Sequence, residues 1–333
     1  VMIYEVAKPT FSDLLGMQRG SSSDEFWRGI TFLGSGKGAL AVILKHLRQR
    51  GIITSKLDEI LVPDWLGYWV YNQIQTYAFP AKSLSPRTRA VMVYHQYGFP
   101  QNMDEVLAEA KKRNLIVIED CAHAVFSHYR GKRVGWMGDY ALFSFSKWVF
   151  CLALGGARSR DPEFENFAAQ EVSQTGRGLT ALKDCAKWFY ESGRARKFAN
   201  YFISMSYALY QRALRPGRLA VRLLKAKLAL EIGLRQRRFQ QFRTYTEGLG
   251  LCDHLEQDGV APYVIPARVK PGRGEALVAA LGGAGIDAGI YQFDINRNLF
   301  SPNFVPVVAI PCHGGIPESA FSTIIDIVKK ANV

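Results

Sequence analysis

The first half of this sequence alternates short apolar runs, rich in strand-forming residues, with helical patterns. Clear strand candidates are Glu59 to Pro63, Ala90 to His95 and Leu115 to Glu119. Between the last two, Met103 to Asn114 has helical spacing, with acids first and bases last, the order that the helix dipole favours. Strands that are apolar throughout are buried on both faces. The pattern therefore predicts an α/β fold with a mainly parallel sheet covered by helices on both sides.

Polar residues stand where these predicted strands end. Asp120 directly follows one apolar run, and the strand Tyr140 to Ser144 is followed three residues later by Lys147. Ligands of such sheets bind beyond the carboxyl ends of the strands. A pyridoxal-phosphate enzyme needs an acid that keeps the ring nitrogen protonated, a lysine that forms a Schiff base and a hydroxyl that faces the phosphate. These residues predict such a site.

Taken singly, each of these residues also has an ordinary structural explanation. Asp120 could cap the following segment or pair with an arginine, since a buried acid without a partner is costly. Lys147 could reach solvent from a strand end. Desolvation within the apolar run Phe143 to Leu154 would favour Schiff-base chemistry, but for Lys147 alone the solvent-reaching side chain is the better explanation.

A glycine-rich turn, Gly34 to Gly38, opens the predicted helix that continues to Arg48. Its backbone N–H groups and the helix N-terminus could cradle a phosphate. The turn is not a nucleotide P-loop, because no Ser or Thr follows Lys37. A tight turn without a ligand would use the same residues.

The rest of the chain falls into two parts. From Phe164 to Arg243 the pattern is helical and basic, with a break at Pro216-Gly217 and an amphipathic helix from Leu219 to Leu234. After Asp253 strands and helices alternate again, which predicts a smaller α/β unit. We therefore expect a large cofactor-binding domain over residues 1–163, a helical connecting segment over residues 164–243 and a small C-terminal domain over residues 244–333.

The formal charge of +13 is concentrated between Arg194 and Arg243, where thirteen basic residues face one acid, Glu231. This excess suits an anionic partner such as a diphosphate-bearing substrate or an anionic membrane surface. A solvated helix face explains it equally well. We expect no nucleic-acid partner, because no recognised binding motif accompanies the charge.

Cysteine usage and hydropathy predict a cytoplasmic protein. No run of about 20 apolar residues and no secretory signal pattern is apparent in the sequence. The cysteines are odd in number and lack metal-type spacing, which favours free thiols in a reducing compartment and predicts no metal site. They are Cys121, Cys151, Cys185, Cys252 and Cys312.

Taken in order, the motifs resemble the DegT/StrS-type family of pyridoxal-phosphate-dependent sugar aminotransferases. The most specific match is Val117 to Ala124, the run Val-Ile-Glu-Asp-Cys-Ala-His-Ala. Further collinear matches are Ser35 to Leu40, Leu57 to Pro63, Pro86 to Gly98, Tyr129 to Gly135 and Gly155 to Ala157. The resemblance implies the aminotransferase fold of fold type I, with a smaller C-terminal domain, and a homodimer whose sites are built from two chains.

The resemblance also assigns roles. Lys147 would hold the cofactor and move protons, Asp120 would pair with the ring nitrogen, and His123 would take the place of the family's usual Gln beside the ring. The phosphate would be bound by Gly36, Lys37, Gly38 and Ser144.

Four positions depart from the family pattern. Lys147 lies two residues closer to Ser144 than usual, and Lys37 replaces a Thr at the phosphate turn. The usual aromatic residue that stacks on the ring is missing, so Trp65 or Tyr68 must take its place. The stretch between Tyr77 and Ser85 is too short for the family's extra strand and loop.

The leading hypothesis is an aminotransferase that moves an amino group from glutamate or glutamine to a keto sugar carried on a nucleotide diphosphate. One alternative is a pyridoxal-phosphate enzyme with a different reaction or a non-sugar substrate. Another is a non-catalytic member whose basic and aromatic region, Phe198 to Leu234, binds a partner or a membrane surface.

Overall fold

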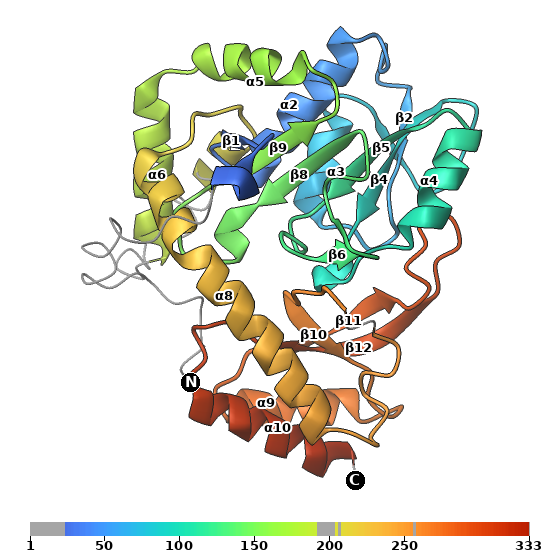
Figure 1. The fold of residues 1–333 in the computed structure, drawn as a ribbon, viewed down its shortest axis with the longest axis vertical. Helices are drawn as coiled ribbons and strands as arrows, with labels where there is room; N and C mark the ends of the chain where they lie inside the picture. Colours follow the sequence, from blue (N-terminus) through green and yellow to red (C-terminus); the bar gives the residue numbers. More distant parts are fainter. Residues whose placement is uncertain (1–23, 192–203, 206–207, 256–257, 333) are drawn as a thin grey trace.

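The computed structural model describes residues 24–191, 204–205, 208–255 and 258–332 (Figure 1). Its main feature is a seven-stranded sheet in the order β1-β9-β8-β5-β4-β2-β3. The five strands from β8 to β3 are parallel, β9 pairs antiparallel with β8, and β1 pairs antiparallel with β9, so that β1 runs in the same direction as the five. The strands are β1 (Thr31–Leu33), β2 (Glu59–Leu61), β3 (Phe79–Ala81), β4 (Thr88–Tyr94), β5 (Ile116–Asp120), β8 (Tyr140–Ser144) and β9 (Gly155–Ser159).

Helices cover both faces of this sheet, as the continuous apolar strands predict. Side chains alternate between the two faces along each strand: on β4, Ala90 and Met92 join one apolar cluster and Val91 and Val93 the other. The first cluster includes residues of α2 (Gly36–Gln49), α3 (Tyr68–Gln75) and α5 (Phe164–Ser173), and the second includes residues of α4 (Met103–Lys112) and α8 (Arg218–Tyr245). The fold therefore confirms the predicted α/β class.

A second, three-stranded sheet in the order β10-β12-β11 forms the C-terminal part. All its pairs are antiparallel, and its core contains residues of the last two helices. The elements are β10 (Val264–Ala267), α9 (Gly274–Gly283), β11 (Gly289–Asp294), β12 (Phe304–Pro311) and α10 (Glu318–Asn332). The domain boundaries that we drew from the sequence stay a prediction.

Helix α8 runs along both parts (Figure 1). Its first half supplies Leu224 and Leu228 to the core of the large sheet, and its second half supplies Phe239 and Phe242 to the core of the small one. Arg235, on the same helix, is 1% exposed and donates to the carbonyl of Tyr263 at 2.7 Å. Part of the basic excess therefore fastens the two parts together instead of facing solvent.

The remaining described elements are short or connect larger ones. Helix α6 (Arg177–Glu191) lies in the connecting segment, whose residues 192–203 and 206–207 lie outside the described residues. The first part of the predicted basic and aromatic region, Phe198 to Leu234, falls partly there. The other elements are the 3₁₀ turns η1 (Asp24–Trp27), η2 (Gln96–Gly98) and η3 (Phe145–Lys147) and the hairpin of β6 (His128–Tyr129) and β7 (Lys132–Arg133).

Two expectations were wrong in detail. The stretch between Tyr77 and Ser85 does contain a strand, β3, which pairs parallel to β2. Three residues suffice because β3 is an edge strand, where Pro80 is tolerated. The sequence from Leu152 to Ala157 also predicts a short strand, but the strand found there is β9, Gly155–Ser159, because Leu152 takes a left-handed conformation with φ of 60°, which interrupts an extended run.

No helix in the described part of the chain is both long and apolar enough to cross a membrane. All five cysteines are free, as predicted, and Cys185 alone among them is exposed.

Candidate active site

The carboxyl ends of β4, β5 and β8 meet at one edge of the large sheet. Tyr94 pairs with Asp120 across β4 and β5, and Asp120 pairs with Leu142 on β8. Because parallel strands point the same way, Tyr94, Asp120 and Ser144 end at a common edge. The sequence placed Asp120 and Ser144 there correctly, but it gave no role to Tyr94.

Asp120 is buried, with 2% of its surface exposed. One oxygen of its carboxyl group accepts a hydrogen bond from the backbone N–H of Ala122 at 2.9 Å. Burial raises the pKa of Asp120, although that hydrogen bond and the nearby charge of Lys147 oppose the shift. A single hydrogen bond offsets little of the free-energy cost of burying a carboxylate, so a cationic donor would stabilise Asp120.

Lys147 ends the short turn η3, which leaves the sheet directly after β8. Its amine lies 2.8 Å from Nε2 of His123. The side chain is exposed, because the turn carries Lys147 out of the apolar run to which it belongs in the sequence. The shortened spacing after Ser144 still brings the amine to the end of β5.

His123 joins Lys147 to Tyr94. The Tyr94 hydroxyl lies 2.6 Å from Nδ1 of His123, and the imidazole stacks on Tyr263, with ring centres 4.1 Å apart. Burial, together with the charges of Lys147 and Arg235, lowers the pKa of His123 well below its usual value. The ring is therefore neutral, with one nitrogen that donates and one that accepts.

A neutral His123 allows two hydrogen-bond arrangements. In one, the Lys147 ammonium donates to Nε2, and Nδ1–H donates to the oxygen of Tyr94. In the other, the Tyr94 hydroxyl donates to Nδ1, and Nε2–H donates to an unprotonated Lys147 amine. The two arrangements differ by one proton on Lys147, so the imidazole can accommodate the lysine in either protonation state.

The glycine-rich turn lies beside the end of β8. Ser35 caps helix α2 by accepting from the N–H of Gly38 at 2.9 Å. Gly36 is required by close packing, because a Cβ atom there would lie 2.8 Å from that of Ser144. The turn and the Ser144 hydroxyl are thus brought together, as the sequence predicted.

Lys37 adds positive charge beside this turn. Its ammonium lies 4.4 Å from the centre of the Trp69 ring. Burial lowers the pKa of Lys37 to about 8, helped by the charges of Lys147 and Lys187. Two further lysines close enough to lower the pKa of Lys37 favour an anion beside it.

Residues 209–215 pack over the same turn, which sequence reasoning missed. The N–H of Gly34 donates to the carbonyl of Leu214 at 2.8 Å, and the Ser35 hydroxyl donates to that of Tyr210 at 2.6 Å. A Cβ at Gly38 would lie 2.5 Å from the carbonyl oxygen of Arg212. The connecting segment therefore fixes the position of the turn.

The two aromatic candidates for stacking on a cofactor ring are both exposed. Trp65 is 56% exposed and lines a cavity beside Tyr94, whereas Tyr68 is 67% exposed and packs edge-on against Trp69. The stacked aromatic pair within the site is instead His123 and Tyr263. Tyr263 lies beyond the long helical segment, and no motif points to it.

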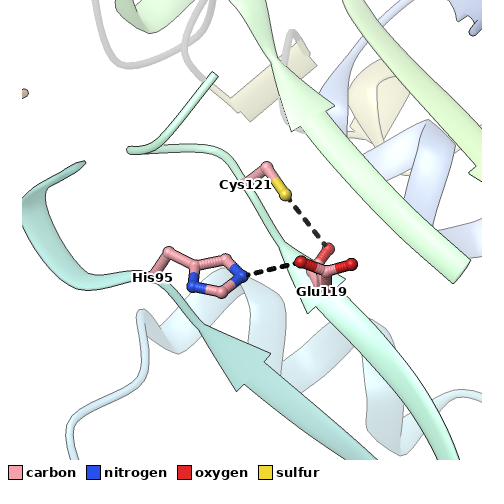
Figure 2. Close-up of side chains that lie close together, drawn as sticks. All are labelled: His95, Glu119 and Cys121. Atoms are coloured by element: carbon pink, nitrogen blue, oxygen red, sulfur yellow. Dashed lines mark hydrogen bonds and ion pairs between the residues drawn. The ribbon is translucent and has the colours of Figure 1, made fainter. Parts of the chain in front are cut away.

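Glu119, the neighbour of Asp120, lies on the opposite face of β5 with His95 and Cys121 (Figure 2). Its carboxylate accepts from Nε2–H of His95 at 3.1 Å and from the N–H groups of Gly135, Met137 and Gly138. Burial alone would raise the pKa of Glu119, but these hydrogen bonds lower it.

The atoms of His95, Glu119 and Cys121 that could bind a metal ion lie within 4.8 Å of one another. We nevertheless interpret the group as a hydrogen-bonded clamp, because the Glu119 carboxylate is already engaged by four donors. Burial also raises the pKa of the Cys121 thiol well above its usual value, which opposes the thiolate form that metals bind.

The residues present fit a pyridoxal-phosphate cofactor. The pyridinium N–H would supply the cationic donor that the buried Asp120 carboxylate calls for. The capped N-terminus of the 14-residue helix α2, together with Lys37, suits a phosphate. The amine of Lys147 lies near both, which is the arrangement that the aldehyde of the cofactor requires.

Comparison with known proteins points the same way. Residues 79–201 match the sequence model of the DegT/DnrJ/EryC1/StrS aminotransferase family. The chain is 48% identical over 118 residues to GDP-perosamine synthase of Escherichia coli O157:H7, covering 30% of this chain and 32% of that protein. It is 41% identical over 153 residues to dTDP-3-amino-3,4,6-trideoxy-alpha-D-glucose transaminase of Streptomyces venezuelae, covering 39% of each. These matches span about a third of the length of the curated relatives.

Comparison with a solved structure shows that the similarity in fold covers nearly the whole chain. The putative sugar aminotransferase Spr1654 from Streptococcus pneumoniae, in its PMP form, superposes with a TM-score of 0.67 and covers 99% of this chain and 98% of its own, at 15% identity. The segment that matches the family contains Asp120, His123, Ser144 and Lys147. The similarity to the DegT/DnrJ/EryC1/StrS aminotransferase family therefore covers the residues of the candidate site.

Proposed function

We propose that this protein is a pyridoxal-phosphate-dependent aminotransferase that moves an amino group from glutamate or glutamine to a keto sugar carried on a nucleotide diphosphate. The observation that carries the proposal is the 2.8 Å contact between the Lys147 amine and His123, beside the buried Asp120. All three residues lie in the segment that matches the family. The names of the relatives, a GDP-sugar synthase and a dTDP-sugar transaminase, support the substrate class.

Bound pyridoxal phosphate supplies an electron sink that stabilises negative charge at the carbon bearing the amino group. The protein must place that sink and handle protons. The Asp120 carboxylate would accept the ring N–H and keep the nitrogen protonated. The N–H groups at the start of α2, the Lys37 ammonium and the Ser144 hydroxyl would bind the phosphate.

The Lys147 amine would move the proton at the reacting carbon. Its neighbour His123 is neutral and bonded to Tyr94, so it can donate to the unprotonated amine and accept from the protonated one. This pairing supports both protonation states of Lys147, which a proton shuttle requires. Tyr263, stacked on His123, would hold the imidazole in place.

The alternative reactions are separated by one experiment that needs no sugar. Protein loaded with pyridoxal phosphate should change its visible absorption when glutamate is added, because the first half of a transamination converts the cofactor to its amine form. Lys147→Ala should remove this response, whereas Lys45→Ala, a lysine of α2 whose amine pairs with Glu171, should keep it. A loaded wild-type protein that does not respond to glutamate or glutamine would contradict the proposal.

A homodimer is part of the same proposal, since the resemblance implies sites built from two chains. Sedimentation of the loaded protein tests it. A monomer that is active at all concentrations would argue against this part alone.

A further inference from the structure

A cavity of about 790 Å³ lies at the edge of the large sheet opposite to the candidate active site. Its lining includes Arg158 and Ser159, the last two residues of β9. Ser159 pairs with Tyr140 at the start of β8, whereas Ser144, at the other end of β8, belongs to the candidate active site. The length of β8 therefore separates this cavity from Lys147.

The lining of this cavity is strongly basic. It contains one acid, Asp104, which forms an ion pair with Arg130 outside the lining. The basic lining residues form no ion pair with a carboxylate within the part of the chain that the structure describes. The cavity therefore carries positive charge that these residues do not neutralise. The five basic residues are Arg28, Lys132, Arg133, Arg158 and Arg160.

Arg133 is held in place by two aromatic rings and a carbonyl group. Its guanidinium carbon lies 3.6 Å from the centre of the Phe26 ring and 3.7 Å from that of the Trp136 ring. Its Nη1 donates to the carbonyl of Phe26 at 2.7 Å. Burial lowers the pKa of Arg133 to about 9, and the charge of Arg158 contributes to the shift. The surroundings therefore fix this cation without neutralising it.

The Nε and Nη2 atoms of Arg133 are enclosed and have no hydrogen-bond partner among the described residues. Arg133 therefore acts on the cavity through its charge. An anion in the cavity would offset part of the free-energy cost of burying this guanidinium.

Arg158 and Arg160 are held by the loop that precedes β8. Arg158 donates to the carbonyl of Gly135 at 3.2 Å, and Arg160 donates to that of Met137 at 2.7 Å. Arg160 is exposed and Arg158 is half-buried. Because a guanidinium group has several N–H donors in a fixed fork, both side chains keep donors for a ligand.

We propose that this cavity binds a diphosphate or triphosphate group and is a second ligand site, distinct from the active site. Phosphate oxygens accept paired N–H groups from arginine, and a polyphosphate brings several negative charges to the five cations. A volume of about 790 Å³ lies within the range of roughly 300–1,000 Å³ that is typical of small-molecule sites. It can therefore hold a nucleotide or free pyrophosphate. The proposal does not depend on the proposed function.

Calorimetry on the full chain tests this site with pyrophosphate, ADP and inorganic phosphate. Pyridoxal phosphate is present throughout, so that the phosphate position of the proposed active site is filled. We expect both diphosphates to bind more tightly than inorganic phosphate, and to bind more weakly as the salt concentration rises. Tighter binding of ADP than of pyrophosphate would identify the ligand as a nucleotide, and the reverse order would identify it as free pyrophosphate.

Variants of the lining locate the site. Arg158→Gln should weaken pyrophosphate binding about tenfold. The double variant Arg28→Gln, Lys132→Gln removes two exposed charges and should weaken it about threefold. Because these two side chains are exposed, the double variant should fold even if Arg158→Gln does not. Arg237→Gln is the matched control: it removes an exposed arginine of α8 outside the lining and should bind as wild type does.

The fluorescence of Trp136 provides a second measurement. Iodide should quench it, as obtained from the difference between wild type and Trp136→Phe, and bound pyrophosphate should reduce the quenching. The proposal would be overturned if neither diphosphate binds, or if the double variant binds pyrophosphate as tightly as wild type. An equal loss in Arg237→Gln, or binding that leaves the quenching of Trp136 unchanged, would also overturn it, because the ligand would then lie elsewhere.

Discussion

Glu119 and Asp120 are adjacent acids at the end of one buried strand, and their environments are opposite. Glu119 accepts four hydrogen bonds, which lower its pKa despite burial. Asp120 accepts one from Ala122, and burial raises its pKa. Because neighbouring residues on a strand face opposite sides of the sheet, one acid is built into the fold, and we propose that the other interacts with a ligand.

The difference teaches how to separate a structural acid from a functional one. Both are almost fully buried, at 0% and 2% exposed, so burial does not distinguish them. What differs is whether the protein itself supplies the donors that a carboxylate needs. The fold supplies four donors to Glu119, whereas we propose that Asp120 gains its second donor from the ring N–H of the cofactor.

Replacing the ligand-facing acid should have the largest effect on activity. Asp120→Asn removes the charge that would hold a proton on the ring nitrogen, so we expect the glutamate half-reaction to slow by at least about 10²-fold. Stopped-flow absorption of the loaded protein measures this rate. Asp253→Asn, an exposed aspartate after α8, is the matched control and should react at the wild-type rate. A loss below about tenfold for Asp120→Asn would remove Asp120 from the site.

Replacing the structural acid should lower stability instead. Glu119→Gln leaves His95 and three buried N–H groups facing a neutral amide, and we expect the free energy of unfolding to fall by about 3 kcal/mol. Urea denaturation of the cofactor-free protein measures it. A loss under about 1 kcal/mol would mean that the clamp contributes little to the fold.

The pH dependence of stability should have opposite sign for the two acids. The raised pKa of Asp120 stabilises the cofactor-free protein below the unfolded pKa of about 3.9, and this contribution is lost as the pH rises through the folded value. The lowered pKa of Glu119 stabilises it above the unfolded pKa, and this contribution is lost as the pH falls through the folded value.

Asp120→Asn should therefore raise the denaturation midpoint of the cofactor-free protein at pH 7, and the gain should shrink near pH 4, roughly the ordinary carboxyl pKa. The measurement is urea denaturation at both pH values. A cofactor-free Asp120→Asn protein less stable than wild type at pH 7 would show that the fold does satisfy this carboxylate.

Thiol labelling tests the burial of this region and is the prediction with the smallest expected effect on activity. Cys121 is fully buried beside Glu119, and burial raises its pKa, whereas Cys185 is exposed. An alkylating reagent should modify Cys185 first and leave Cys121 intact in the native protein, with no loss of activity. Peptide mass spectrometry locates the label. Modification of Cys121 as fast as Cys185 would mean that this edge of the sheet opens readily.

The sequence was sufficient for the features that depend on local pattern. Continuous apolar runs predicted the parallel strands, and their ends placed Asp120 and Ser144 at one edge. The glycine-rich turn and the helix after it were also predicted, because capping and turn chemistry are local. Order along the chain, together with these motifs, indicated the family.

The remaining features depend on contacts between distant segments. Tyr263 stacks on His123 across 140 positions of the chain, and Ser35 donates to Tyr210 across 175. No periodicity or spacing in the sequence reports such pairs. The apolar run around Lys147 likewise gives no sign of the turn η3 that carries its side chain outward.

Trapping the cofactor on the chain tests the central claim most directly. Borohydride reduction of the protein loaded with pyridoxal phosphate fixes the aldehyde carbon to the lysine with which it has condensed, and peptide mass spectrometry locates that residue. We predict a single modified peptide, with the cofactor on Lys147. Modification of another lysine, such as Lys37 or Lys183, or no modification at all, would contradict the assignment of the site.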